Sequence, residues 1–219
     1  MGDLNGDGYL DVFAAVQPSS AGGSYEIADR VLLNDGTGNF RDSGQRLAEP
    51  DQRATNESGP IAFLRDFQFP WAAQAGRIAG STAVALGDLD NDGDLDALVG
   101  KATGAVIWIN QGGAQGGQEG IFASSDQWIP GSRTEAVFLT DLDKDGDLDA
   151  IVADKNRASI WWNDGKAGFQ DSGQRLRYNE KHGLAVGDFN GDGYPDVFSA
   201  AYDIEFHLWL NQGNGLLGR

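Results

Sequence analysis

The sequence lacks cysteine, which excludes disulfide bonds, thiolate metal sites and cysteine nucleophiles. Histidine occurs only at His182 and His207, and neither lies in a motif with a nucleophile. No stretch approaches the ~20 apolar residues of a membrane-spanning helix. The opening segment MGDLNGDGYL has neither the basic residues nor the apolar run of a signal peptide. We therefore expect no membrane insertion and no signal peptide in this chain.

Proline is also scarce, at 6 of 219 residues, whereas glycine occurs 32 times. This glycine content is about twice the usual share of ~7% and indicates many tight turns. The 40% of hydrophobic residues can form a core in a chain of this length. The apolar runs are 4–8 residues long and show no helical period, so we predict an all-β fold.

Basic residues are in the minority, with 16 Lys and Arg against 33 Asp and Glu, which gives a net charge of −17. This charge repels phosphate backbones, so we expect no nucleic-acid partner. The excess acid lies in four segments that fit the pattern D-x-[DN]-x-D-G-x-x-D: DLNGDGYLD at 3–11, DLDNDGDLD at 88–96, DLDKDGDLD at 141–149 and DFNGDGYPD at 188–196. Carboxylates this close together repel one another unless a cation lies among them.

The ligand types in these segments favour calcium, since the pattern offers hard oxygen ligands and no His or Cys. Side chains at positions 1, 3, 5 and 9 and the backbone carbonyl at position 7 can converge on one ion, and the glycine at position 6 permits the sharp turn. We expect about four Ca²⁺ ions per chain. The predicted ligands are Asp3, Asn5, Asp7, Asp11, Asp88, Asp90, Asp92, Asp96, Asp141, Asp143, Asp145, Asp149, Asp188, Asn190, Asp192 and Asp196, with the carbonyls of Tyr9, Asp94, Asp147 and Tyr194.

Two other interpretations of these segments are weaker. An EF-hand needs a glutamate at position 12 and flanking helices. Position 12 is Ala14, Val99, Val152 or Ser199, and the flanks are strand-like. A single Asp- and Gly-rich segment would also suit an ordinary solvated turn. Four copies in the same nine-residue register argue against that.

The acidic segments belong to longer repeats. Asp88 and Asp141 are 53 residues apart, and Asp141 and Asp188 are 47 apart. Each segment is followed by an apolar run that ends in asparagine: RVLLND at 30–35, AVIWINQ at 105–111, SIWWND at 159–164 and HLWLNQ at 207–212. Each unit therefore predicts four short strands, as in a β-propeller blade. A linear stack is the alternative, but a β-helix coil uses fewer strands per unit.

These residues resemble the FG-GAP/VCBS repeat family, which includes the heads of integrin α-subunits and many bacterial surface and secreted proteins. The resemblance rests on the acidic loops, the A-V-x-x-G-D segment that precedes Asp88, and the N-x-G-x-G-x-F turn. It implies a calcium-binding β-propeller and an extracellular or cell-surface location, and it implies no one activity. AVFLTD at 136–141 departs from the usual Gly-Asp, which should change the turn and not the ligands.

We predict a single propeller domain or propeller fragment of about four blades, with units at about 1–47, 81–130, 131–178 and 179–219 and an insertion at 48–80. The first unit lacks its opening strand and the last is expected to lack its closing strand, which leaves fourteen strands. Exposed strand edges are normally avoided. Four arrangements would cover these edges: a homodimer, completion of a blade by another chain, a ring that closes with incomplete blades, or origin in a longer propeller.

The aromatic residues leave two questions open. Phe63, Phe67, Phe69 and Trp71 in the insertion suit either packing or an exposed recognition loop. Trp108, Trp161, Trp162 and Trp209 lie in predicted third strands, where packing between blades is favoured over stacking on sugars. In the pair Trp161 and Trp162, adjacent side chains point to opposite faces, so one should be buried and the other more exposed.

We expect a binding or adhesion module for a protein or glycan ligand, with structural calcium. A carbohydrate-binding, lectin-like propeller is the alternative. An enzyme that degrades polysaccharides is the weakest hypothesis, because the sequence shows no acid and base pair outside the acidic loops. We therefore predict no catalytic residues.

Overall fold

The computed structural model describes residues 1–16, 28–48, 80–113, 116–178, 181–201 and 206–218. Within these ranges the chain contains strands and turns and no α-helix, as the short apolar runs predict. No described helix is long and apolar enough to cross a membrane. The strands form four antiparallel sheets, which follow one another along the sequence.

The sheets are numbered in chain order. Sheet 1 contains β1 (Val12–Ala14), β2 (Arg30–Asn34) and β3 (Phe40–Asp42). Sheet 2 contains β4 (Ser81–Gly87), β5 (Asp96–Lys101), β6 (Gly104–Asn110) and β7 (Phe122–Pro130). Sheet 3 contains β8 (Ala136–Thr140), β9 (Asp149–Ala153), β10 (Arg157–Asn163) and β11 (Phe169–Arg177). Sheet 4 contains β12 (Lys181–Gly187), β13 (Asp196–Ala201), β14 (Phe206–Asn211) and β15 (Leu217–Gly218).

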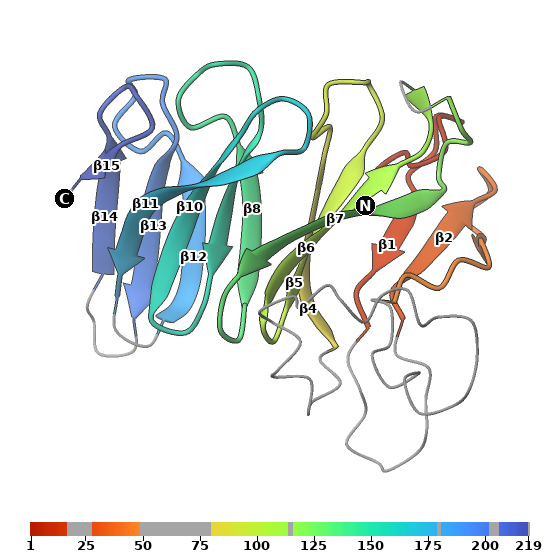
Figure 1. Ribbon diagram of the computed structural model, residues 1–219, viewed down its shortest axis with the longest axis horizontal. Coiled ribbons are helices and arrows are strands. Elements are labelled where there is room, and N and C mark those ends of the chain that lie inside the picture. The colour runs from red at the N-terminus through yellow and green to blue at the C-terminus, as the bar shows by residue number, and fades with distance from the viewer. Residues whose placement is uncertain (17–27, 49–79, 114–115, 179–180, 202–205, 219) are drawn as a thin grey trace, which may run out of the picture.

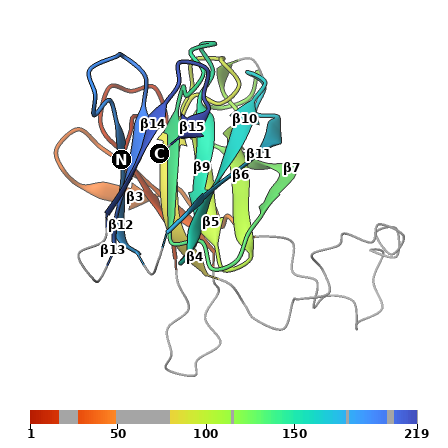
Figure 2. The ribbon, with the colours of Figure 1, turned by 90° about the vertical axis from the view of Figure 1, so that its left-hand side faces the viewer.

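Each sheet is a simple meander in which consecutive strands pair, because short turns can join only antiparallel neighbours. The four sheets stand side by side, with sheet 4 at one end of the row and sheet 1 at the other (Figure 1). The view at right angles shows them stacked behind one another (Figure 2). Residues of β4, β8 and β12 line a shared hollow of about 600 Å³. The first strands of three sheets therefore face the same space.

The core is divided into three apolar layers, each between two neighbouring sheets. Successive side chains along each strand point to opposite faces of its sheet, so alternate residues of the second and third strands face the preceding and the following sheet. Trp161 is buried against sheet 2, whereas Trp162 is only half-buried, which confirms the predicted split of this pair. Trp108 and Trp209 are also buried between sheets. Packing, not sugar stacking, is therefore the role of these three buried tryptophans.

The predicted strand order within a unit is confirmed in sheets 2 and 3, and the predicted total of fourteen strands is wrong. The described residues contain fifteen, because β15 pairs with β14, with Leu210 opposite Gly218 and Asn211 opposite Leu217. The N–H of Leu217 also donates to the side chain of Gln174 in sheet 3, which helps to hold this two-residue strand. Sheet 1 lacks a full opening strand, as predicted, and has only an isolated bridge between Gly2 and Asp11. Residues 49–79 of the predicted insertion, including its four aromatics, lie outside the described residues.

Candidate metal centres

The four acidic loops occupy equivalent places in the fold. In sheets 2, 3 and 4 the loop connects the first strand to the second, and in sheet 1 it precedes β1. Glycine at position 6 has a positive φ in every loop, at 87°, 98°, 102° and 88° for Gly8, Gly93, Gly146 and Gly193. This left-handed backbone disfavours other residues and turns the chain back over the side chain at position 1.

Hydrogen bonds inside each loop turn carboxylates toward its centre. The aspartate at position 1 accepts the N–H of position 6, at 2.8 Å for Asp3 and 3.0 Å for Asp88. The aspartate at position 5 accepts the N–H of position 7 at 2.9 Å in all four loops. The repeated geometry shows that the shared sequence pattern specifies one loop conformation.

The aspartate at position 9 begins the next strand in sheets 2, 3 and 4 and directly precedes β1 in sheet 1. It is fully buried in all four loops: Asp11, Asp96, Asp149 and Asp196. One oxygen of Asp149 accepts the N–H of Leu142 at position 2, over 2.9 Å. Its other oxygen accepts the N–H of Asn163 in the third strand, over 3.0 Å. The other three loops have the same pair of bonds. This side chain therefore ties the loop to the sheet, a role that the ligand pattern alone did not reveal.

Two loops bring three carboxylates together. In loop 88–96 the triad is Asp88, Asp90 and Asp96, and in loop 141–149 it is Asp141, Asp143 and Asp149. One oxygen from each member lies within 4.8 Å of the others, a separation that one cation can bridge. One buried oxygen of Asp141 has no hydrogen-bond partner. A buried carboxylate oxygen without a donor is costly, and a cation would satisfy it.

Loops 3–11 and 188–196 differ at position 3, where they carry Asn5 and Asn190. The amide nitrogen of Asn5 donates to Asp7 over 3.0 Å, and that of Asn190 donates to Asp192 over 2.8 Å. Position 3 is a member of the acidic triads in the other two loops, so these two loops, which carry an amide there, form no acidic triad among their described residues. The predicted calcium ligands at positions 1, 3, 5, 7 and 9 of every loop, including the backbone carbonyls, stay predictions.

Burial and repulsion shape the electrostatics of the two triads. Burial raises the pKa of Asp96 to about 7, and the nearby Asp90 and Asp92 add to the rise, against the two N–H donors that lower it. Burial likewise raises the pKa of Asp149 to about 7. The pKa of Asp143 is raised by burial and then by the charge of Asp145. Burial and the neighbouring charges therefore disfavour the ionised form of these carboxylates, and a bound divalent cation would stabilise that form.

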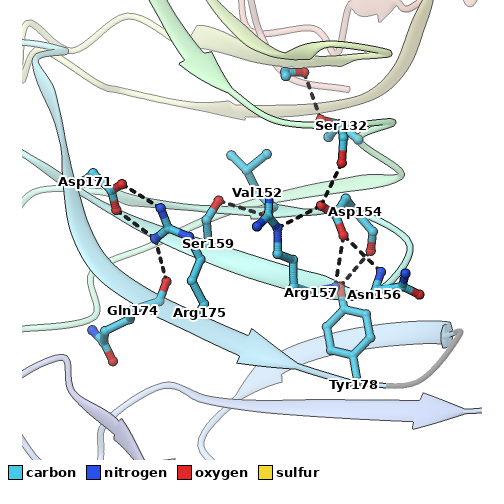
Figure 3. Close-up of polar contacts among 12 residues, drawn as sticks. Ser132, Val152, Asp154, Asn156, Arg157, Ser159, Asp171, Gln174, Arg175 and Tyr178 are labelled. Atoms are coloured by element: carbon cyan, nitrogen blue, oxygen red, sulfur yellow. Dashed lines mark hydrogen bonds and ion pairs between the residues drawn. The ribbon is translucent and has the colours of Figure 1, made fainter.

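A second polar site lies between sheets 2 and 3, in a hollow of about 280 Å³ (Figure 3). Asp154 accepts hydrogen bonds from the hydroxyl of Ser132 over 3.2 Å and from Nε of Arg157 over 3.1 Å. The hydroxyl of Tyr178 donates to the backbone carbonyl of Asp154 over 2.9 Å. Arg175 lines the same hollow and pairs with Asp171. Sequence reasoning missed this site, because its residues share no motif and come together only where the segment between β7 and β8 meets β9, β10 and β11.

Two solved structures are similar to this chain, and the first of them shares its fold. A lectin from Agrocybe aegerita, described as recognising non-reducing terminal N-acetylglucosamine, is 21% identical over 99% of this chain and 49% of its own, with a TM-score of 0.53. The Photorhabdus luminescens Tc holotoxin pore is 22% identical over 94% of this chain and 9% of its own, with a TM-score of 0.45. The chain thus spans about half the length of the lectin chain and much less of the toxin chain.

No curated protein matches the sequence of this chain. The FG-GAP-like repeat matches it twice, at residues 3–63 and 141–199, which together make up more than half of the chain. The second match contains loops 141–149 and 188–196, and the first contains loop 3–11. The repeated loops, the four-stranded sheets and these matches agree: the chain belongs to the FG-GAP-like repeat family.

Proposed function

We propose that this chain forms β-propeller blades whose acidic loops bind calcium and that it acts as a binding module. The observation that carries the calcium proposal is the pair of acidic triads, whose oxygens lie within 4.8 Å of one another. Only oxygen atoms converge there, and hard oxygen ligands suit Ca²⁺. The hollow lined by β4, β8 and β12 supports a radial arrangement of the sheets.

We expect about four ions per chain. Loops 88–96 and 141–149 already hold the carboxylates of positions 1, 3 and 9 close together. In loops 3–11 and 188–196 the Asn5 and Asn190 amides would need to turn their oxygens toward the ion, because an amide nitrogen is a donor and not a ligand. The first two loops should therefore bind calcium more tightly than the other two.

Isothermal titration calorimetry on chelator-stripped protein tests this proposal, together with a native mass spectrum that counts retained ions. The variant Asp143→Asn should remove one of the tighter sites, because it takes one carboxylate from a triad. Asp126→Asn makes the same charge change at an exposed position outside the loops and should retain every site. If the chain takes up no calcium, or if both variants behave alike, the proposal is wrong.

A glycan is the second candidate ligand. The hollow between sheets 2 and 3 offers Ser132, Asp154 and Arg157 as donors and acceptors around one concave surface, which suits a hydroxyl-rich ligand. The lectin with this fold makes N-acetylglucosamine the first sugar to test. We expect Arg157→Ala to weaken binding to an immobilised glycan with a terminal N-acetylglucosamine, and Arg133→Ala, at an exposed position outside the lining, to leave it unchanged. Equal binding by both variants would exclude this hollow as the glycan site.

The remaining functional assignments rest on the family. We propose that the module is extracellular or at the cell surface and recognises a protein or glycan, with no catalytic activity of its own. Calcium would then stabilise the loops and carry no chemistry, since no described group beside the triads suits nucleophilic attack or proton transfer.

A further inference from the structure

Three junctions between neighbouring sheets are built to one pattern. The forward face of a sheet, which points to the next sheet, is formed by loop position 2 and a cross-strand pair between the second and third strands. In sheets 1 to 3 these residues are buried: Leu4, Phe13 and Val31; Leu89, Leu98 and Ile107; Leu142, Ile151 and Ile160. The rear face of the next sheet covers them with Ala97, Trp108 and Phe122; Ala150, Trp161 and Phe169; Val197, Trp209 and Leu217.

Sheet 4 repeats this forward face, and there it is exposed. The equivalent residues are Phe189, 50% exposed, and the cross-strand pair of Phe198 with Leu208, which is 37% exposed. Phe206 is 68% exposed, whereas Ala158, the equivalent residue of sheet 3, is buried. The ring of Phe198 lies 5.9 Å from that of Phe189 and 6.1 Å from that of Phe206. A continuous apolar patch of this kind marks an interaction surface.

Sheet 1 presents the matching rear face. The pair of Val12 and Leu32 in sheet 1 is equivalent to the pair of Ala97 and Trp108 in sheet 2. Val12 and Leu32 are half-buried. Phe40 is 44% exposed, whereas its counterpart Phe122 is 6% exposed in the junction with sheet 1. The described chain thus has one unfilled forward face on sheet 4 and one unfilled rear face on sheet 1.

A polar contact repeats across the junctions as well. The side-chain amide of the asparagine that ends the third strand donates to the carbonyl at loop position 2 of the preceding sheet: Asn110 to Leu4 at 3.0 Å, Asn163 to Leu89 at 2.9 Å and Asn211 to Leu142 at 2.8 Å. The side-chain amide of Asn34 in sheet 1 donates to the carbonyl of Leu10 in its own loop and, among the described residues, to no carbonyl of another sheet. The carbonyl of Phe189 in sheet 4 accepts no hydrogen bond from the described residues.

We propose that the forward face of sheet 4 docks onto the rear face of sheet 1 of a second copy of this chain. The junction continues the established pattern, with Asn34 of one copy donating to the carbonyl of Phe189 of the other. The side-chain sizes also complement each other. Leu32 stands where the other rear faces carry tryptophan, and the space that the indole would take is filled by the larger Phe198 and Phe206 of the opposing face.

This contact is heterologous, because it joins two different faces. It therefore leads either to a closed ring of copies or to a longer head-to-tail array. Both assemblies contain the proposed contact, and neither requires calcium to take part in it directly.

Sedimentation velocity across a range of protein concentrations, in calcium and 0.15 M salt to limit repulsion between the acidic copies, tests the contact. We expect the unmodified chain to associate. Leu208→Asp on the forward face and Phe40→Asp on the rear face should each raise the dissociation constant at least about tenfold. Both side chains are exposed within one copy, so the fold should survive, which a thermal melt confirms. Ile121→Asp, at an exposed apolar residue outside both faces, should associate as the unmodified chain does.

Mixing the two blocked variants gives the decisive result. Leu208→Asp retains a rear face and Phe40→Asp retains a forward face, so the mixture should form a one-to-one dimer that neither variant forms alone. A native mass spectrum with one variant labelled with ¹⁵N identifies this species. An unmodified chain that is monomeric at all concentrations would overturn the proposal. So would a Phe40→Asp variant that still self-associates, since this would indicate contact between two forward faces.

Discussion

The side-chain amide of Asn163 in sheet 3 donates a hydrogen bond of 2.9 Å to the carbonyl oxygen of Leu89 in the loop of sheet 2, 74 residues earlier. The N–H of the same asparagine donates to Asp149 in its own loop. One residue therefore links two acidic loops, and the arrangement recurs at the other junctions between sheets. The candidate metal centres and the stacking of the sheets therefore share residues.

Asn163→Ala should destabilise the fold by about 1–3 kcal/mol, because Asn163 is 6% exposed and its removal leaves buried polar groups without their partner. Chemical denaturation measures this change. Asn39→Ala removes an amide from an exposed turn and should change stability by less than about 0.5 kcal/mol. Equal effects of the two substitutions would show that the cross-sheet bond contributes little.

Calcium removal should lower the thermal midpoint. At a calcium concentration about ten times Kd, each bound ion stabilises the folded state by about 1.4 kcal/mol. Excess chelator removes this contribution and leaves the loop carboxylates to repel one another. Adding back calcium should restore the midpoint, and the same concentration of magnesium should restore it less, because magnesium demands a stricter octahedral geometry. An unchanged midpoint in chelator would contradict structural calcium.

Asp143→Asn and Asp149→Asn should separate ligand and scaffold roles within one triad. Asp149→Asn places an amide nitrogen against a backbone N–H donor, so the calcium-free protein should lose about 1–3 kcal/mol of stability. The pKa of Asp143 is raised by burial and by the charge of Asp145, so its ionised carboxylate is unfavourable in the calcium-free fold. Asp143→Asn removes this charge and should therefore leave the stability of the calcium-free protein equal or higher, while weakening calcium binding. Denaturation in chelator and calorimetric titration measure the two effects. If both variants lose the same stability in chelator, the scaffold role of Asp149 is wrong.

Calcium-free protein should lose stability as the pH rises from 5 to 8. Burial raises the pKa of Asp96 and Asp149 to about 7, well above the usual value for an aspartate of 3.8. A group whose folded-state pKa is raised stabilises the fold below its unfolded value, and this contribution disappears as the pH passes the folded value. Calcium favours the ionised form, so saturating calcium should flatten the pH profile. Thermal melts with chelator and with calcium test this, and parallel profiles would contradict it.

Ser199→Val should stabilise the protein by about 1 kcal/mol. Ser199 is fully buried, and its hydroxyl has no hydrogen-bond partner among the described residues. Valine removes that unsatisfied group and adds apolar contact. Val99 and Val152 occupy the equivalent positions in sheets 2 and 3, so the larger side chain suits the site. A lower melting temperature would instead show that sheet 4 has no room for it.

Much of the local structure follows from the sequence. Glycine at position 6 demands a left-handed turn, the repeated aspartates demand a cation or protons, and runs such as AVIWIN pair as strands through their alternation. These are short-range effects, so four copies of one pattern specify four copies of one loop between two strands. The buried and half-buried members of the pair Trp161 and Trp162 follow for the same reason.

Other features depend on residues that are far apart in the sequence. Position 9 looks like one more ligand in the pattern, yet Asp149 is buried because Asn163 and Leu142 supply its donors. The hollow around Asp154 exists only where sheets 2 and 3 meet. The short strand β15 depends on Gln174 in the neighbouring sheet.

The sequence by itself determined the loop conformation, the all-β architecture and the oxygen-rich chemistry of the candidate metal centres, since these depend on neighbours within about nine residues. Only the tertiary structure decided which carboxylates form triads, which aromatics are covered and which faces stay open. Phe189 and Leu142 occupy the same loop position, and one is 50% exposed while the other is buried. The difference arises because sheet 4 covers Leu142, whereas no described sheet covers Phe189.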